Sequence, residues 1–554
     1  PYGPRRCNDG GAWRFDPKSF RLERLQVDIS NPWGFSFDTW EQPFISDASP
    51  GENWWALPFS AKMPYGIEQV KVEQFVPKRS RPSSGAEFVS SRHFPDVNQG
   101  DFMACNTIGF LGISFGSKRD EGAGFVGKAN GDLLSSSDGN FRPVDLEFAP
   151  DGSLYFVDWH NPLIGHMQHN ARDPNRDHEH GRIYRVTYPG RPLVKPAKVD
   201  GATVAELLEN LKEPEYRTRY RTRRELRSHA PAEVLPAIKA WVAKLDPKDS
   251  AYEHHLCEAL WATWAQNQPD AELLQRLMRA QRFEARAAAV DVLRHSYRQI
   301  PNHVALLQEA VRDEHPRVRL TAIVAASWLD NAEGAKIALE AFRKPVDRWV
   351  GPVLHYALAY TLKDDVATLK ASGQLDLADN PAAVEYLAGK SKIGQPLKDN
   401  LPKPTRKLTA SEDKVFQQGR EIYFRDGHCA TCHQADGKGL ANIYPPLAKS
   451  DWLEDDERLI KIILKGLWGP ITVNGQAFDP SKGVPPMPGF GGMLNDAETA
   501  AVLNFTRLSF GNNGKLISPA QVAKVRAATQ ERTNFYMTEE ILKEHPLKPA
   551  QGTK

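Results

Sequence analysis

The sequence predicts a multidomain fold in which a partial β-propeller is followed by an α-solenoid and by a small all-α domain. Three observations lead to this prediction. Short runs of alternating apolar and polar residues, rich in Gly and Pro, fill residues 1 to about 190 and are typical of strands. From about 195 to 400 the apolar residues recur with a helical period. Nearer the C-terminus, two helix-start signals flank a Cys-Ala-Thr-Cys-His run.

Length and composition fit a globular protein of several domains. The chain has 554 residues, of which 41% are hydrophobic and 25% charged, and domains commonly hold about 100–200 residues. The net charge of +2 argues against a nucleic-acid-binding surface and against an acidic tail. No apolar run is long enough to span a bilayer, and no basic and apolar leader opens the sequence.

Residues 1–192 carry an internal repeat that predicts propeller blades. Residues 31–47 and 142–158 both run from a proline in second position through an alternating strand and a turn to a second strand that ends in aspartate. Their offset suits two blades, because one blade takes about 40–50 residues, and a middle unit fits around residues 100–105. We therefore expect three or four blades. A six-bladed ring would need about twice this much chain, so a preceding N-terminal segment or another chain would complete it.

The last of these blades carries a polar loop. Its histidines are His160, His166, His169, His178 and His180, and aspartates and arginines lie among them. Three interpretations remain open: a substrate or cofactor pocket with a histidine as general base, a metal site, or a solvated loop whose salt bridges lock the blade. For the first interpretation, the candidate catalytic residues are His166, His169 and Arg142.

Residues 193–395 predict a HEAT-like α-solenoid. The segment 285–290 is echoed by 318–323, and His315-Pro316-Arg317 resembles the helix-opening signature of a HEAT repeat. We expect four or five helix pairs. Their simplest role is a spacer that holds the two ends of the chain in a fixed relation, and a concave face for a partner is the alternative. A proline-rich linker over residues 396–408 follows.

The run Cys429-Ala430-Thr431-Cys432-His433 is the attachment signature of a c-type haem. Cys429 and Cys432 can each form a thioether to a haem vinyl group, and His433 would then ligate the iron. The alternatives are a redox dithiol or half of a zinc site. The flanking sequence favours haem, so the third domain, residues 409–512, is predicted to be an all-α cytochrome c domain.

Two helices should frame this haem. Residues 409–412 and 495–498 each have the spacing of a helix N-cap with an acid at the third position. Small cytochromes c pack such first and last helices across each other. A glycine at the crossing lets two backbones approach closely, and we expect Gly419 to lie against Phe505.

The sixth iron ligand should come from a loop between these helices. No histidine follows His433 within the domain, so a methionine is expected, and Met487 and Met493 are available. Met487 is favoured because prolines stiffen its loop, whereas Met493 is expected to pack in the core. A His/Met pair raises the haem potential and leaves no open site at the iron. Tyr444 and Pro446 are expected to line the histidine side, where a proline carbonyl could accept the Nδ1–H of His433.

The remaining cysteines and the C-terminal tail carry little chemistry. Cys7, Cys105 and Cys257 are an odd number, and a Cys7–Cys105 disulfide is one alternative in an oxidising compartment. The tail, residues 513–554, is polar, and we expect a helix near 519–532 that docks on another domain.

Several of these features together resemble a known family. Residues 31–34 (Asn-Pro-Trp-Gly), the loop 165–182, the HEAT-like centre and the Cys-x-x-Cys-His domain resemble the multidomain haem-binding, membrane-bound dehydrogenase-like proteins of the Planctomycetes–Verrucomicrobia–Chlamydiae group. The propeller portion is similar to the glucose/sorbosone dehydrogenase family. The resemblance implies a periplasmic sugar or alcohol dehydrogenase that passes electrons from a pyrroloquinoline quinone (PQQ) site, with calcium as a helper, to the haem.

Two functions are therefore expected from the sequence. In the first, the propeller oxidises a hydroxyl and a redox partner protein takes the electrons from the haem. In the second, the propeller and the solenoid are docking surfaces of a non-catalytic electron-transfer subunit in a larger complex. Covalent haem attachment takes place outside the cytoplasm, so we expect an exported, periplasmic protein, held at a membrane only through a partner, whose export signal precedes this sequence.

Overall fold

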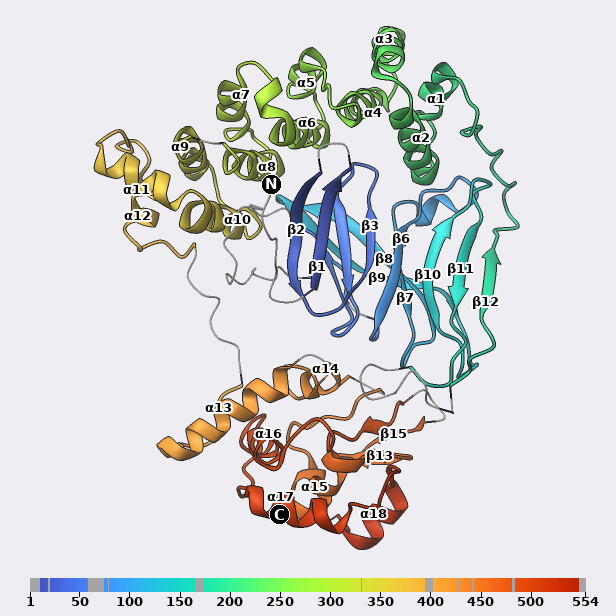
Figure 1. Ribbon diagram of the computed structural model, residues 1–554, viewed down its shortest axis with the longest axis vertical. Helices are drawn as coiled ribbons and strands as arrows, with labels where there is room; N and C mark the ends of the chain where they lie inside the picture. The colour runs from blue at the N-terminus through green and yellow to red at the C-terminus, as the bar shows by residue number, and fades with distance from the viewer. Residues whose placement is uncertain are drawn as a thin grey trace.

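The computed structural model describes residues 10–547, except for 18–19, 58–73, 78, 165–173, 175, 330, 394–401, 426–427, 441–442 and 481–483. It has three parts (Figure 1). The β-sheets lie in the middle, the helical repeats arch over one side of them, and the helices that follow residue 409 form a compact domain on the opposite side.

The N-terminal part contains four antiparallel sheets in the residues described. Their strands are β1 (Gly10–Asp16) and β2 (Arg21–Ile29); β3 (Pro32–Phe37), β4 (Pro43–Asp47) and β5 (Glu52–Trp55); β6 (Ser83–Phe88), β7 (Phe102–Asn106), β8 (Gly112–Glu121) and β9 (Gly124–Ser135); and β10 (Pro143–Phe148), β11 (Leu154–Asp158) and β12 (Arg182–Val186). The first strands of the last three sheets, β3, β6 and β10, lie side by side, with β6 between the other two. Successive sheets of this kind are what blades would give, but the described sheets form no closed propeller.

The predicted internal repeat is present as two hairpins in the same register. Pro32 lies opposite Asp47 in β3–β4, and Pro143 lies opposite Asp158 in β10–β11. In each hairpin the aspartate carboxylate accepts a hydrogen bond from the backbone N–H of the residue before the proline, at 3.0 Å and 2.7 Å. The aspartate thus closes the open end of the hairpin.

A third copy of this hairpin begins at Arg81-Pro82. Ser83 of β6 lies opposite Asn106 of β7, and the Nδ2 of Asn106 donates to the carbonyl of Pro82 at 3.2 Å. The sequence hides this copy because asparagine replaces aspartate and a long connection, residues 89–101, separates the strands. The residues before the three prolines, Asn31, Arg81 and Arg142, consequently occupy equivalent positions at one rim of the sheets.

The helical part contains more helix pairs than the sequence predicts. Its helices are α1 (Val204–Asn210), α2 (Tyr216–Ser228), α3 (Pro231–Val242), α4 (Tyr252–Ala265), α5 (Ala271–Leu277), α6 (Phe283–Ser296), α7 (His303–Ala310), α8 (Pro316–Ala326), α9 (Glu333–Glu340), α10 (Val350–Tyr356), α11 (Lys363–Ala371) and α12 (Pro381–Leu387). In the described residues these make six pairs rather than four or five. Several helices have only seven or eight residues, too few turns for a periodic signal.

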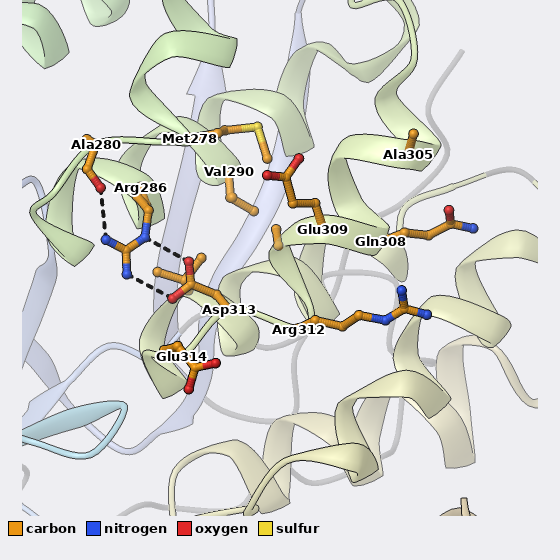
Figure 2. Close-up of a pocket in the computed structure, with 12 residues that line it drawn as sticks. Met278, Ala280, Arg286, Val290, Ala305, Gln308, Glu309, Arg312, Asp313 and Glu314 are labelled. Atoms are coloured by element: carbon orange, nitrogen blue, oxygen red, sulfur yellow. Dashed lines mark hydrogen bonds and ion pairs between the residues drawn. The ribbon is translucent and has the colours of Figure 1, made fainter. Parts of the chain in front are cut away.

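Arginines in the first turns join one repeat to the next, as the HEAT-like pattern implies. Pro316 begins α8 as expected. Arg286 of α6 makes a two-point hydrogen bond with the Asp313 carboxylate, at 2.7 and 2.9 Å. This pair lies at the edge of a polar groove of about 720 Å³ between α5–α8 (Figure 2). The groove is built from inter-repeat contacts and shows no convergent set of catalytic groups.

The solenoid and the sheets share one apolar core, so the solenoid is not a separate rod. Phe44, Trp55 and Phe125 of the sheets belong to the same buried cluster as the solenoid helices. The rings of Trp55 and Trp349 lie 5.9 Å apart, edge to face. The Arg317 guanidinium of α8 lies 3.9 Å from the centroid of the Phe125 ring.

A buried charge network reinforces this junction. Glu258 of α4 is fully buried and accepts hydrogen bonds from Arg219 and Arg223 of α2, both at 2.9 Å. Arg219 also donates to the Thr39 hydroxyl, and Arg223 pairs with Glu41 of the β3–β4 turn. Burial acts to raise the pKa of Glu258, but the two guanidinium groups outweigh it and hold this pKa below its usual value. The network therefore depends on an ionised Glu258.

We expect Glu258→Gln to destabilise the junction by about 3–5 kcal/mol, because it leaves the buried Arg219 without a counter-charge and Arg223 with Glu41 alone. The measurement is urea unfolding followed by tryptophan fluorescence, with haem absorbance as a separate probe of the C-terminal domain. Glu272→Gln, an exposed carboxylate of α5, is the control and should leave the midpoint unchanged. Equal midpoints for the two variants would contradict the structural role of the network.

Candidate haem site

Two crossing helices frame the candidate site as predicted. Helix α13 (Ala410–Phe424) begins with a capping box between Thr409 and Glu412, and α16 (Asp496–Leu508) begins with one between Asn495 and Glu498. A Cβ atom built on Gly419 would lie 2.0 Å from the Ala501 carbonyl oxygen and 2.8 Å from the Cβ of Phe505. The predicted placement of Gly419 against Phe505 is confirmed, and only glycine permits this crossing.

The other elements complete the domain around this pair. They are α14 (Cys429–His433), α15 (Asp456–Lys465), β13 (Gly466–Trp468), β14 (Ile471–Val473), β15 (Gln476–Phe478), β16 (Met487–Pro488), α17 (Pro519–Ala528), β17 (Tyr536–Met537) and α18 (Thr538–Glu544). The C-terminal tail packs on this domain, since β17 pairs with β13 and α17 contacts α15 and α16. Its first helix ends at Ala528, four residues before the predicted end.

Helix α14 holds the two cysteines and the histidine of the attachment signature on one helical turn. The His433 Nδ1 lies 2.8 Å from the Pro445 carbonyl oxygen. A carbonyl oxygen only accepts hydrogen bonds, so Nδ1 carries the proton and the Nε2 lone pair remains for iron. Burial lowers the pKa of His433, more than the Pro445 carbonyl raises it. A neutral imidazole with a fixed tautomer is the form that ligates haem iron.

The surroundings of the cysteines also fit a haem. Burial raises the pKa of the Cys429 thiol to about 12, so it is a neutral thiol before attachment. Tyr444 and Pro446 were predicted to lie beside the haem; Tyr444 is buried, and Pro446, two residues later, is half-buried. The Tyr444 hydroxyl and the Nε of Arg81 are buried without a hydrogen-bond partner among the described residues. Such orphaned groups are rare in a closed core and mark space that a further group shares.

The two candidate methionines lie in different apolar clusters. Met487 of β16 lies opposite Leu467 of β13 and packs against the cluster around Trp452. Met493 packs against the main core of the domain, which is the same cluster that Cys429 contacts. Phe490, at the end of the Met487 loop, has its ring 5.4 Å from that of His428, the residue before Cys429. The loop therefore reaches the attachment helix, and the choice of Met487 stays a prediction.

The predicted catalytic residues of the polar loop are only partly visible. His166 and His169 lie outside the described residues. The Arg142 guanidinium donates to the carbonyls of Asn161 and Thr107 at 3.0 Å and of Pro162 at 3.2 Å, and burial lowers its pKa to about 10. These contacts give Arg142 a structural role, because they hold the loop against the neighbouring sheet; they do not test its predicted catalytic role.

The described part of the loop is rich in ion pairs. The Asp177 carboxylate accepts backbone N–H groups of Glu179 and His180, which hold its pKa at about 2, and it contacts the His180 Nδ1 at 2.9 Å. Arg182 pairs with Asp138 at 3.1 Å. Within the described residues, no three His, Cys, Asp or Glu side chains are grouped for a metal ion. These contacts support the interpretation of the segment as a loop that salt bridges hold against the blade.

The sequence missed one residue of the site altogether. Arg81, which begins the third hairpin of the β-sheet part, reaches the attachment helix and places its Nη2 3.0 Å from the Cys432 Sγ. The signal that could have found it is the Arg81-Pro82 dipeptide, which repeats Arg142-Pro143. Position in the repeat would have placed it at the rim, but not against the haem-binding domain.

Two thiols one turn apart, an imidazole with its Nδ1 engaged and two helices crossing at a glycine define a c-type haem site. Models of three families match the chain: DUF7133, a domain of unknown function, over residues 66–190; HEAT repeats over 270–359; and cytochrome c over 416–507. The cytochrome c match implies a covalent haem c and haem-based electron transfer.

Curated proteins similar to the chain are also cytochromes. Cytochrome c-552 of Thermus thermophilus is 36% identical over 119 residues, which cover 20% of this chain and 84% of that protein. The chain therefore belongs to the cytochrome c family through its C-terminal domain. The cytochrome c subunit of the quinone-type alcohol dehydrogenase of Gluconobacter oxydans is 29% identical over 33% of this chain, and the match spans 42% of that subunit. The gluconate 2-dehydrogenase cytochrome c subunit of Pantoea cypripedii is 35% identical over 20% of this chain and 24% of its own length.

Two further predictions concern the surroundings of the domain. None of the helices in the described ranges is long and apolar enough to cross a bilayer.

Cys105 and Cys257 are buried free thiols, and burial raises the pKa of both. Cys7 lies outside the described residues, so its pairing stays untested.

We expect Gly419→Ala to destabilise the haem domain by at least about 1–3 kcal/mol, the usual cost of overpacking a core. The added methyl group would meet the Ala501 carbonyl and force the two helices apart. The measurement is thermal unfolding followed by haem absorbance. Gly492→Ala is the matched control, because nothing lies within 4 Å of a Cβ at that position; a Gly419→Ala midpoint equal to that of the control would refute the crossing.

Proposed function

We propose that this chain is an exported electron-transfer protein. In this proposal the dehydrogenase-like β-sheet part oxidises a sugar or an alcohol and a haem c in the C-terminal domain receives the electrons. The haem is attached to Cys429 and Cys432 and ligated by His433 and Met487, with Tyr444 and Pro446 beside it. When bound, such a His/Met haem supplies one-electron chemistry at a high potential.

The observation that carries the proposal is that the β-sheet part and the haem domain are in contact at one rim of the sheets. The polar loop after β11 and the residues that face the haem domain belong to this same rim. Arg142 links them, because it binds the Asn161 carbonyl of the loop and the Thr107 carbonyl of the neighbouring turn. Gly109 of that turn packs against Ile443, where an added Cβ would lie 2.6 Å from the side chain. Ile443 directly precedes Tyr444, so packed residues connect the loop to the haem site.

The chemistry of the β-sheet part requires a two-electron carrier. Oxidation of a hydroxyl to a carbonyl releases two electrons and two protons, whereas a haem takes one electron at a time. A quinone of the PQQ class, with calcium, would accept both electrons and both protons and pass the electrons on singly. The choice of PQQ rests on the resemblance of the β-sheet part to the glucose/sorbosone dehydrogenase family, and similarity to the cytochrome c subunit of an alcohol dehydrogenase supports a haem as the electron acceptor. A candidate substrate hollow of about 340 Å³ lies between Trp33, Asp145 and Trp159.

The alternative is a non-catalytic electron-transfer or scaffold subunit of a larger redox complex. It is favoured by an exposed apolar face on the β10–β12 sheet, where Val157 and Ile183 are cross-strand partners with 42% and 74% of their surface exposed. In a propeller such a face is covered by the next blade. We propose that a partner chain covers it and that the similarity to dehydrogenase subunits reflects such an assembly.

We expect Met487→Ala to abolish methionine ligation while the haem stays covalently attached. Loss of the sulfur ligand should remove the far-red sulfur-to-iron absorption band of the oxidised protein and lower the midpoint potential. Met493→Ala is the matched control and should keep the band. The reverse pattern would assign the ligand to Met493.

Substrate-driven reduction of the haem tests the catalytic proposal. The air-oxidised protein, loaded with PQQ and calcium, is given a panel of sugars and alcohols while the reduced-haem bands are recorded. We expect at least one substrate to reduce the haem, and omission of quinone to abolish the reduction.

Reduction by dithionite alone would refute the catalytic proposal and leave the subunit interpretation. That interpretation has its own check, which is light scattering of the native-length protein. A complex with a second chain would support it, and a monodisperse monomer would contradict it.

A further inference from the structure

We infer that Arg81, a residue of the β-sheet part, is a positioning residue of the haem in the C-terminal domain: it presents a fixed positive charge to the Cys432 edge of the haem and raises its reduction potential. The inference needs only the covalent haem and is independent of any substrate. It makes the haem environment a product of two domains rather than one.

The first support is the contact itself. The Arg81 Nη2 donates to the Cys432 Sγ at 3.0 Å, and its guanidinium carbon lies 5.4 Å from the centroid of the Tyr444 ring. Cys432 provides one of the two thioether sulfurs, so its sulfur is bonded to the periphery of the macrocycle. A thioether sulfur still accepts a weak hydrogen bond. Attachment therefore preserves the partner atom beside the guanidinium and brings the haem next to the charge.

The second support is that the Arg81 side chain is partly buried, with its Nε fully enclosed, and has no carboxylate partner in the described residues. An arginine guanidinium stays charged in proteins, so attachment of the haem to the Cys432 sulfur leaves the positive charge in place. The Arg81 Nε and the Tyr444 hydroxyl find no hydrogen-bond partner in that part of the chain. A partly buried charge is screened by less water than an exposed one, so it acts more strongly on its surroundings. Reduction makes the haem one unit more negative, which a nearby cation favours.

The third support is that the segment carrying Arg81 is held in place. Ser80 is fully buried and its hydroxyl donates to the Ile108 carbonyl. Asn106 donates to the carbonyls of Ser80 and Pro82, at 3.4 and 3.2 Å. These bonds belong to the third hairpin of the repeat. The guanidinium is thus presented by the framework of the sheets and not by a free loop.

The chain offers a matched control on the same segment. Arg79, two residues earlier, has half of its side chain exposed and is paired with Asp132 at 3.1 Å. Its charge is neutralised by the partner and screened by solvent. Arg79→Gln therefore removes one positive charge from the same segment without removing it from the haem edge.

The experiment is a mediated spectroelectrochemical titration of the full-length holoprotein, with four samples: the parent, Arg81→Met, Arg81→Lys and Arg79→Gln. We expect Arg81→Met to shift the ratio of reduced to oxidised haem at a fixed potential about tenfold towards oxidised, which is about 59 mV for one electron. Arg81→Lys should recover most of the shift because it keeps the charge. Arg79→Gln should stay at the parent value.

Two results would overturn the inference. One is an unchanged potential in Arg81→Met with the haem attached; the other is an equal shift in Arg79→Gln, which would assign the effect to net charge. Retention of the far-red ligation band in each variant excludes loss of the axial sulfur as the cause. If Arg81→Met fails to mature, Arg81→Gln replaces it and the same comparison decides. The titration uses chemical mediators, so failure of the substrate experiment leaves its result intact.

Discussion

The closure of three equivalent hairpins is the constraint on which the arrangement of the sheets depends. In each hairpin the second strand ends in an Asp or Asn. Its side chain forms a hydrogen bond with the backbone of the X-Pro dipeptide at the start of the first strand. This fixes the residue before the proline at the rim. The three equivalent positions differ in their contacts: Asn31 closes its hairpin, Arg142 holds the polar loop, and Arg81 reaches the haem-binding domain.

Local signals allowed the haem domain to be predicted in detail. The two capping boxes, the glycine crossing and a proline carbonyl at His433 are all confirmed, because each depends on residues close in sequence or on one close backbone approach. The β region and the helical repeats were predicted as classes of structure. The helix count was too low, since seven-residue helices carry too few turns to be counted from periodicity.

What the sequence could not show are contacts made only by the folded chain. Arg81 and Cys432 are 351 positions apart, and Arg223 and Glu41 are 182 apart. No local pattern indicates which charges become buried neighbours, since a charged residue on a strand end or a helix face is usually solvated. From the sequence we expected the solenoid to be a spacer, whereas its apolar core is continuous with that of the sheets.

This continuity changes how the haem is held relative to the sheets. A spacer would set the distance between the two end domains through its own length. Here the solenoid is fused to the sheets on one side, and the haem domain touches them directly on the other, at Cys432 and Ile443. The rim, where the three hairpins open, is therefore in direct contact with the haem domain. Electron transfer falls steeply with distance, so a direct contact between rim and haem domain is the arrangement that a coupled oxidation would need.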